Sequence, residues 1–354
     1  MNVKIWDYYK SKELANWAKG QFEGLTFTHE MPGGMVSASF SIPEKYSLPF
    51  KWADVFNQVE IYHGPTKVWR GFVFGLERFW DENNSGIKID NVGMGAKLNM
   101  LGTATDLSNE KGSTFITDHI LTGELANWIS AGTIDTLDYT IPGLREYKPY
   151  KTFRQILEDI ATFNDYNWYV WDDKLYWEPA ETDVTYITDV EHCTGSVRQD
   201  LSEFANEVRY SFRNANGIWT FGTLTDDDTD YPQVKRPESY SDNMTAEQGS
   251  QLATISLAEH KTLGAVAGVT ISKVWNVRGQ KIHVSELKPG KVIYINGLIP
   301  AKASPSEAFI DNDIDTFVIR QIVYNDDDQT VQVSPGNLPQ TLPIILNRIS
   351  QVKK

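Results

Sequence analysis

The side chains with the greatest potential for chemistry are the histidines and the cysteine, and neither type has the spacing of a catalytic or metal site. The six histidines are isolated in the sequence, with no HExxH pair: they are His29, His63, His119, His192, His260 and His283. A single cysteine, Cys193, excludes an internal disulfide framework and a cysteine-based zinc site. Phosphate-binding glycine loops, GxSxG elbows and dinucleotide fingerprints are also missing from the sequence.

Two groups of aspartates have the composition of a calcium loop. The first group comprises Asp226, Asp227, Asp228 and Asp230, and the second comprises Asp311, Asp313 and Asp315. The second group resembles the start of an EF-hand loop, but its sixth position is Thr316 instead of glycine and its twelfth is Ile322 instead of glutamate. We therefore expect both groups to be solvated turns.

Paired carboxylates beside tryptophan would suit glycoside hydrolysis, which needs two acids close in space. The candidate pairs are Glu77 with Asp90, and Glu178 with Asp172 beside Trp171 and Trp177. Because the chain has 47 acidic residues, such a pair is expected by chance. We assign no catalytic, cofactor-binding or metal-binding residue, and we expect a protein without enzymatic activity. The 11 tryptophans leave a carbohydrate-binding role open.

Composition describes a folded, acidic protein. The 354 residues are 41% hydrophobic and 23% charged, a length that predicts two to four domains. The net charge of −14 argues against binding nucleic acid by neutralising phosphates, although an acidic channel would repel phosphate and let a strand pass. No apolar run approaches about 18 residues, and the start lacks a secretory signal. We expect synthesis in a cytoplasm and no membrane insertion.

Residues 1–103 have the pattern of a small antiparallel β-barrel. The turn at 31–34 precedes a strand over 35–42, in which every second residue is apolar. A hairpin over 59–74 follows, and a third strand over 87–92 completes the unit.

Residues 104–187 predict an α+β insert. Residues 117–129 have helical spacing. A second helix begins after Thr152, with Gln155 in the position of a capping box. Its apolar stripe comprises Phe153, Ile156, Leu157, Ile160 and Phe163. An aromatic hairpin over 168–177 ends the insert.

Residues 188–354 predict a second β-barrel region with one helix. Strands at 206–212 and 218–223 precede a helix at about 245–263, for which Gly264 is the expected C-terminal cap. The remaining strands are expected at 269–274, 281–284, 292–295, 317–323 and 331–333. The tail from Leu338 is interpreted as a peripheral strand or a C-terminal arm.

Two stretches of the chain repeat one strand-and-turn pattern. The first consists of VEIYHG at 59–64, a strand ending at Trp80, the turn DENNSG, and Ile87 and Ile89. The second consists of VIYING at 292–297, a strand ending at Tyr324, the turn NDDDQT, and Val331 and Val333. Because side chains alternate between the faces of a sheet, matching turn length and apolar register predict two similar β units.

This layout resembles the hub proteins of phage tail tips and baseplates, a family that includes myophage baseplate hubs and siphophage tail-associated proteins. The resemblance lies in the segments PGGMVSASFSIP, VEIYHGPTKVWRGFVFGLER, TFRQILEDIATFNDYNWYVWDDKLYWEP, NEVRYSF, VIYING and DTFVIRQIVYN and in the capped helix at 245–263. Hub proteins of this family share layout far more than sequence identity.

The resemblance implies two tube-like antiparallel β-barrels and a small α+β domain. It implies a homotrimer whose six barrels close the sixfold tail tube, with a channel through which the tape measure and DNA leave. The implied partners are distal tail and tail tube proteins, the tape measure protein and tail fibre or receptor-binding components, with DNA only in transit, in the virion tail tip. No cofactor is implied. A carbohydrate-binding or glycan-cleaving tail protein and a hexameric distal tail ring protein remain alternatives.

Overall fold

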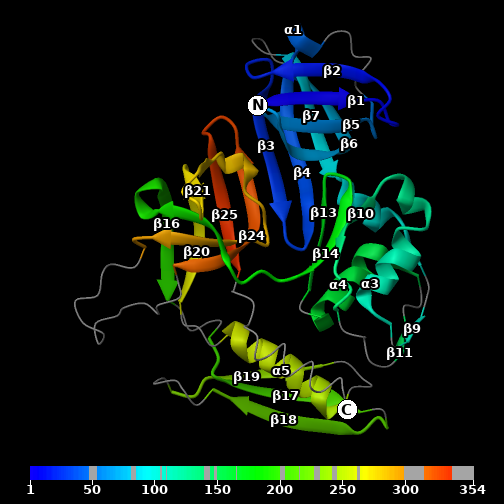
Figure 1. Cartoon of the computed structure of the whole chain (residues 1–354), viewed down its shortest axis with the longest axis vertical. Helices are drawn as coiled ribbons and strands as arrows, with labels where there is room; N and C mark the ends of the chain where they lie inside the picture. Colours follow the sequence, from blue (N-terminus) through cyan, green and yellow to red (C-terminus); the bar gives the residue numbers. More distant parts are fainter. Residues whose placement is uncertain are drawn as a thin grey trace.

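The computed structural model describes residues 1–354 except 48–53, 81–84, 104–105, 109, 139–143, 147–149, 165, 200–203, 215, 227–231, 241–244, 261–263, 299–314 and 337–354. The fold is mainly β, and eighteen of its described strands form one connected, curled sheet (Figure 1). Among the described helices, none has the length and apolar character needed to cross a membrane.

The first unit is a curled antiparallel sheet of seven strands. They are β1 (Asn2–Trp6), β2 (Glu13–Ala18), β3 (Glu23–Glu30), β4 (Gly33–Pro43), β5 (Gln58–His63), β6 (Thr66–Trp80) and β7 (Ser85–Gly93). Their order in the sheet is β2-β1-β5-β6-β7-β4-β3. The alternation predicted for β4 is confirmed from Ala38 to Ile42, because Ala38, Phe40 and Ile42 are buried. It fails at the start of the strand, where a register shift leaves Val36 partly buried and Met35 buried instead. A short helix, α1 (Glu44–Ser47), follows β4.

The insert packs one long helix against an aromatic hairpin. Helix α4 (Phe153–Asn164) lies beside β13 (Tyr166–Trp171), which pairs with β14 (Lys174–Pro179). The predicted capping box is confirmed, because Thr152 Oγ1 accepts a hydrogen bond from the Gln155 N–H at 3.3 Å and Gln155 Oε1 accepts one from the Thr152 N–H at 3.1 Å. The shorter strands are β8 (Gly102–Thr103), β9 (Asp106–Ser108), β10 (Ser130–Ile134), β11 (Leu144–Glu146) and β12 (Lys151–Thr152).

The helix expected over 117–129 is replaced by short turns of different kinds. They are α3 (Gly112–Phe115), the π-helical turn η3 (Ile116–Ile120) and the 3₁₀ turn η4 (Glu124–Asn127). Gly123 has an extended backbone and separates the last two, as expected of a poor helix former. Ile120 and Leu125 are nevertheless buried in the insert core, together with four of the five stripe residues of α4. The side chain of the fifth, Phe163, lies outside those described.

The second unit begins with β15 (Val184–Asp189), which pairs with β21 and β23. Its other strands are β16 (Cys193–Gln199), β20 (Gly264–Ile271), β21 (Val274–Asn276), β22 (Lys281–Ile282), β23 (Val292–Asn296), β24 (Thr316–Asn325) and β25 (Thr330–Gly336). The 3₁₀ turns η5 (Val190–His192) and η6 (Val284–Glu286) connect some of them, while η2 (Met94–Ala96) and α2 (Lys97–Met100) follow β7.

The part of the chain between β16 and β20 forms a separate three-stranded sheet with one helix. Its strands are β17 (Glu207–Arg213), β18 (Trp219–Thr225) and β19 (Lys235–Ser239), and α5 (Ala246–His260) covers one face (Figure 1). The two predicted strands and the predicted helix are confirmed, but β19 was not predicted and the predicted cap is wrong. Gly264 does not end the helix, since it is the first residue of β20 and pairs with Gln199.

Candidate functional site

The two β units repeat one topology, and this duplication is the main functional feature of the structure. In the first unit the order is β5-β6-β7-β4-β3, with every neighbour antiparallel. In the second unit the order is β23-β24-β25-β20-β16, again with every neighbour antiparallel. The hairpin β3–β4 therefore corresponds to the pair β16–β20, and the separate sheet with α5 is an insertion between the two strands of that pair.

A β-bulge at one matching place sets the residue-level alignment of the two units. The β6–β7 register shifts between Val73 and Gly75, and the β24–β25 register shifts between Ile319 and Gln321. Because bulges interrupt a ladder at defined positions, the shared bulge aligns Leu76 with Ile322. The facing strands then align Ile87 with Val331 and Ile89 with Val333. All four of these facing residues are buried, as the apolar register predicted.

Two details of the predicted repeat are wrong. Trp80 does not correspond to Tyr324, because Arg78 pairs with Ile87 just as Tyr324 pairs with Val331. Trp80 is 75% exposed whereas Tyr324 is buried, so the first hairpin is two residues longer than the second. The segments VEIYHG and VIYING are also offset by one residue, since Gln58 faces Phe72 as Val292 faces Val318. Both differences are hard to see in the sequence, because the two polar turns and the two apolar segments have similar compositions.

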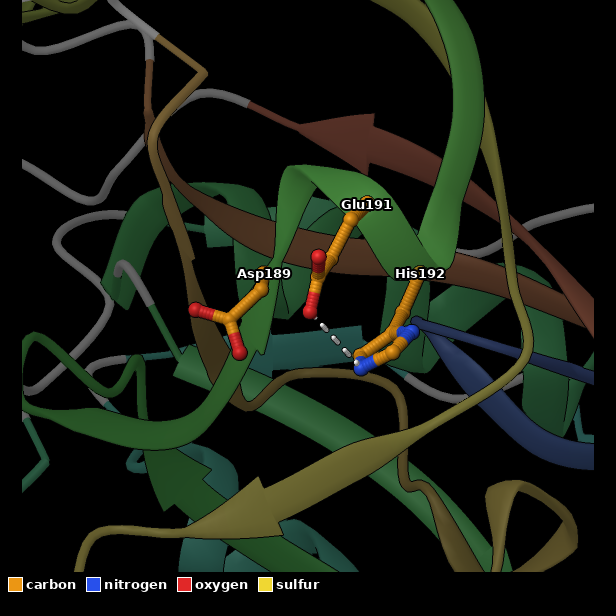
Figure 2. A group of neighbouring side chains, drawn as sticks. All are labelled: Asp189, Glu191 and His192. Carbon is orange, nitrogen blue, oxygen red and sulfur yellow. Dashed lines mark ion pairs between the residues drawn. The ribbon is translucent and has the colours of Figure 1, made fainter.

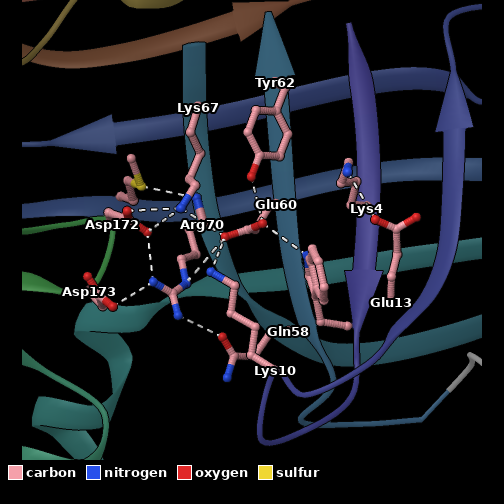
Figure 3. A network of polar contacts seen from close by, with 12 residues as sticks. Lys4, Lys10, Glu13, Gln58, Glu60, Tyr62, Lys67, Arg70, Asp172 and Asp173 are labelled. Carbon is pink, nitrogen blue, oxygen red and sulfur yellow. Dashed lines mark hydrogen bonds and ion pairs between the residues drawn. The ribbon is translucent and has the colours of Figure 1, made fainter. Parts of the chain in front are cut away.

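A buried ionic network links the first unit to the insert (Figure 3). The Glu60 carboxylate on β5 has a 1% exposed side chain and lies 2.7 Å from Lys10 Nζ and 2.8 Å from Lys67 Nζ. It also accepts hydrogen bonds from the Tyr62 hydroxyl at 2.7 Å and from Trp6 Nε1 at 2.9 Å. Burial by itself raises the pKa of Glu60, but the two ammonium groups and the Tyr62 hydroxyl outweigh it and hold the pKa at about 2.

Arg70 on β6 carries the network across to the β13–β14 turn. Its guanidinium lies 2.9 Å from Asp172 Oδ1 and 2.7 Å from Asp173 Oδ2, and it donates to Gln58 Oε1 at 2.9 Å. Lys67 reaches the same Asp172 at 2.9 Å. A planar guanidinium suits such simultaneous contacts. The first unit and the insert are thus held by specific charge pairing in addition to packing.

A second junction of the first unit with the insert is a cationic side chain among aromatic rings. Lys97 Nζ lies 4.3 Å from the ring centroid of Trp128, 4.7 Å from Phe72 and 5.2 Å from Phe56. Burial lowers the pKa of Lys97. These distances are those of cation–π interactions. The residues of this contact are widely separated along the chain, so no local sequence pattern predicts it.

One described cluster could hold a metal ion (Figure 2). Asp189, Glu191 and His192 each offer a ligand atom, and these atoms lie within 4.8 Å of one another. His192 Nε2 lies 3.5 Å from Glu191 Oε1, and Asp189 Oδ1 accepts a hydrogen bond from Asn296 at 2.8 Å. The sequence signal for this cluster is the short segment 189–192, in which His192 follows two acidic residues but is far from every other histidine. Because Glu191 is exposed and Asp189 already has a partner, a solvated turn explains the same arrangement.

Three of the four carboxylates considered for glycoside hydrolysis, those of Asp172, Glu178 and Asp90, have side-chain partners. Asp172 belongs to the ionic network, and Glu178 accepts a hydrogen bond from the Tyr169 hydroxyl at 2.9 Å. Asp90 accepts a hydrogen bond from Ser39 at 2.8 Å, whereas Glu77 lies opposite Lys88 in the β6–β7 ladder through its backbone.

The tryptophans beside those acids pack against other side chains. Trp177 is buried, and its Nε1 donates to Asp138 at 3.1 Å. Trp171 is partly buried against the main core, with Lys288 Nζ 4.9 Å from its ring centroid. These contacts favour packing roles for both tryptophans.

Histidines that are isolated in the sequence come together in the fold. His63 stacks on His283 with ring centroids 3.7 Å apart, and His63 Nδ1 lies 3.0 Å from Glu286 Oε1. His29 is fully buried, and burial lowers its pKa to about 3.

Most residues of the two aspartate groups lie outside the described part of the chain, so the question of calcium binding is not tested.

The fold of this chain is similar to the folds of several solved tail proteins. The 43 kDa tail protein of prophage MuSo2 from Shewanella oneidensis matches with a TM-score of 0.64 and 12% identity, over 96% of this chain and 98% of that one. The tail protein from Neisseria meningitidis MC58 matches with a TM-score of 0.67 and 13% identity, over 95% and 96%. The prophage tail protein gp18 from Listeria monocytogenes EGD-e matches with a TM-score of 0.63 and 12% identity, over 100% and 99%.

Sequence comparison gives no such match, since neither a protein-family model nor a curated protein matches the chain. The likeness therefore lies in the arrangement of the strands and extends over nearly the whole length of each structure. The chain has the fold of phage tail proteins.

Proposed function

We propose that the protein is the structural hub of a phage tail tip or baseplate, a homotrimer that closes the sixfold tail tube. The observation that carries this proposal is the duplicated topology, in which five strands of each unit follow one order with a bulge at the same place. Three chains with two similar units each present six similar surfaces, which is what docking on a sixfold ring requires. The shared fold with phage tail proteins supports the same role.

The proposed domains are residues 1–103 as the first tube-like barrel, 104–187 as the α+β insert and 188–354 as the second barrel region. The pairing of β15 with β21 and β23 supports a boundary slightly earlier, at Val184. The proposed partners are distal tail and tube proteins, the tape measure protein and fibre or receptor-binding components. Tape measure and DNA would leave through the channel, and the −14 net charge favours passage of phosphate without retention.

The role is mechanical and not enzymatic. The similar structures are tail proteins, and Asp172, Glu178, Asp90, Trp171 and Trp177 have partners in ion pairs, hydrogen bonds or core packing. None of the three tryptophans of the aromatic hairpin offers an open platform for a sugar, because Trp168 and Trp177 are buried and Trp171 packs against the core and Lys288, so the glycan-binding alternative gains no support. A hexameric distal tail ring protein needs one such unit per chain, and the second unit speaks against it.

Native mass spectrometry of the purified chain tests the proposal. We expect assemblies of three chains, and cryo-electron microscopy of them should show a channel surrounded by six similar β units. Six chains per assembly would favour the distal tail ring protein instead. A protein that remains a single chain at all accessible concentrations would refute the hub.

A further inference from the structure

Strand β24 has neighbours along both of its edges. One edge pairs with β25 over its length. The other edge is shared, because β23 pairs with residues 316–318 and β3 pairs with residues 321–325. The β3–β24 pairing is a contact between the two units of a single chain.

Strand β6 is the equivalent of β24, and one of its edges is incomplete. It pairs with β7 on one edge, and on the other it pairs with β5 through Phe72. Two further backbone hydrogen bonds extend that contact to Val73. In the described part of the chain, no strand pairs with residues 74–80 on this edge, which we call the open edge of β6. Apolar residues are exposed along it, since Phe74 is 65%, Leu76 36% and Trp80 75% exposed.

Strand β16 is the equivalent of β3, and it has a free edge. Among the described strands it pairs with β20 alone. Its residues Thr194, Gly195 and Ser196 are exposed. In Figure 1, β16 and β6 lie on different sides of the molecule, so they do not meet within one chain. Unpaired edges of this kind readily accept a strand from another chain.

We infer that β16 of one copy pairs antiparallel with the open edge of β6 in a second copy. We choose β16 as the partner of the open edge because β3, its equivalent in the first unit, already pairs with the matching edge of β24 within the chain. This inference rests on the proposed homotrimer and names its contact surface. Each chain offers one β16 and one open edge, so three copies close a ring in which three such contacts are internal and three join neighbouring chains.

The internal contact also sets the register of the contact between chains. Phe27 on β3 faces Tyr324 on β24 within the chain. The alignment of the two units places Ser196 of β16 at the position of Phe27, and Arg78 of β6 at the position of Tyr324. We expect these two residues to face each other directly across the ladder, where Cβ atoms are close enough for a disulfide.

Disulfide cross-linking tests this register. In a Cys193→Ser background, the double variant Ser196→Cys, Arg78→Cys should form covalent dimers and trimers under mild oxidation. The matched control combines Ser196→Cys with Thr223→Cys on the exposed face of β18, and we expect it to remain uncross-linked. Native mass and circular dichroism of each variant establish that it folds and assembles.

Hydrogen exchange of the unmodified chain gives a second measurement. Amides of 193–199 and 74–80 should exchange at least about tenfold more slowly in the trimer than in diluted single chains, because inter-strand pairing protects them. A trimer without cross-links and without this protection overturns the strand contact but leaves the hub proposal intact. A protein that never forms an oligomer overturns both.

Discussion

Removing the Glu60 carboxylate should reveal how strongly the ionic network holds the first unit to the insert. A carboxyl whose pKa falls from 4.5 to about 2 on folding gains about 3 kcal/mol from ionisation. Lys10 and Lys67 are 30% and 22% exposed, and solvent screening reduces this gain to about 1–2 kcal/mol. Losing one member of a buried ion pair also leaves its partners uncompensated. We therefore expect Glu60→Gln to lower the free energy of unfolding at pH 7 by about 2–3 kcal/mol.

The pH dependence gives this prediction its sharpest form. Because the pKa of Glu60 is lowered on folding, its stabilisation is present above pH 4.5 and is lost as the pH falls toward 2. The difference between wild type and Glu60→Gln should therefore shrink across this range. Urea unfolding followed by circular dichroism at several pH values measures it directly. Acid effects from other groups, including His29, act on both proteins and cancel in the difference.

Glu13→Gln provides a matched control. Glu13 pairs with Lys4 at 2.9 Å, but the two side chains are 35% and 27% exposed (Figure 3). We expect that substitution to cost under about 1 kcal/mol, since exposed pairs contribute little. The reasoning is refuted if the two substitutions cost the same, or if the Glu60→Gln difference stays constant from pH 7 to pH 2.5.

Three further predictions concern the core and the second junction. Trp177→Ala should lower the free energy of unfolding by about 3–5 kcal/mol in urea unfolding, because the ring is buried. A smaller effect together with lost glycan binding would restore the sugar-binding alternative. Because the pKa of His29 is lowered to about 3, stability should fall as pH drops below 6.5 toward 3, and His29→Leu should flatten this slope; an unchanged slope contradicts it. Lys97→Met should lower the thermal midpoint by an amount equivalent to about 1–2 kcal/mol, whereas Lys97→Arg should preserve the midpoint. Equal decreases of the thermal midpoint in both variants would exclude a cation–π role.

Helices and strands were predicted well where they depend on residues close together in the sequence. The Thr152 and Gln155 capping box lies at the start of α4, and the alternation of Ala38, Phe40 and Ile42 gave the buried face of β4. Helix ends were less predictable, because the extended backbone of Gly123 and the strand pairing of Gly264 depend on neighbours far away in the chain.

Two β units with a common pattern can be predicted from the amino acids alone, because period-two alternation is a local property of each strand. Tertiary structure decided the alignment of those units, since only the pairing of β6 with β7 and of β24 with β25 shows the shared bulge. It also decided the ionic network and the stacked histidines. Glu60 and Asp172, like His63 and His283, are far apart in sequence, and such contacts form only when long-range strand pairing brings their elements together.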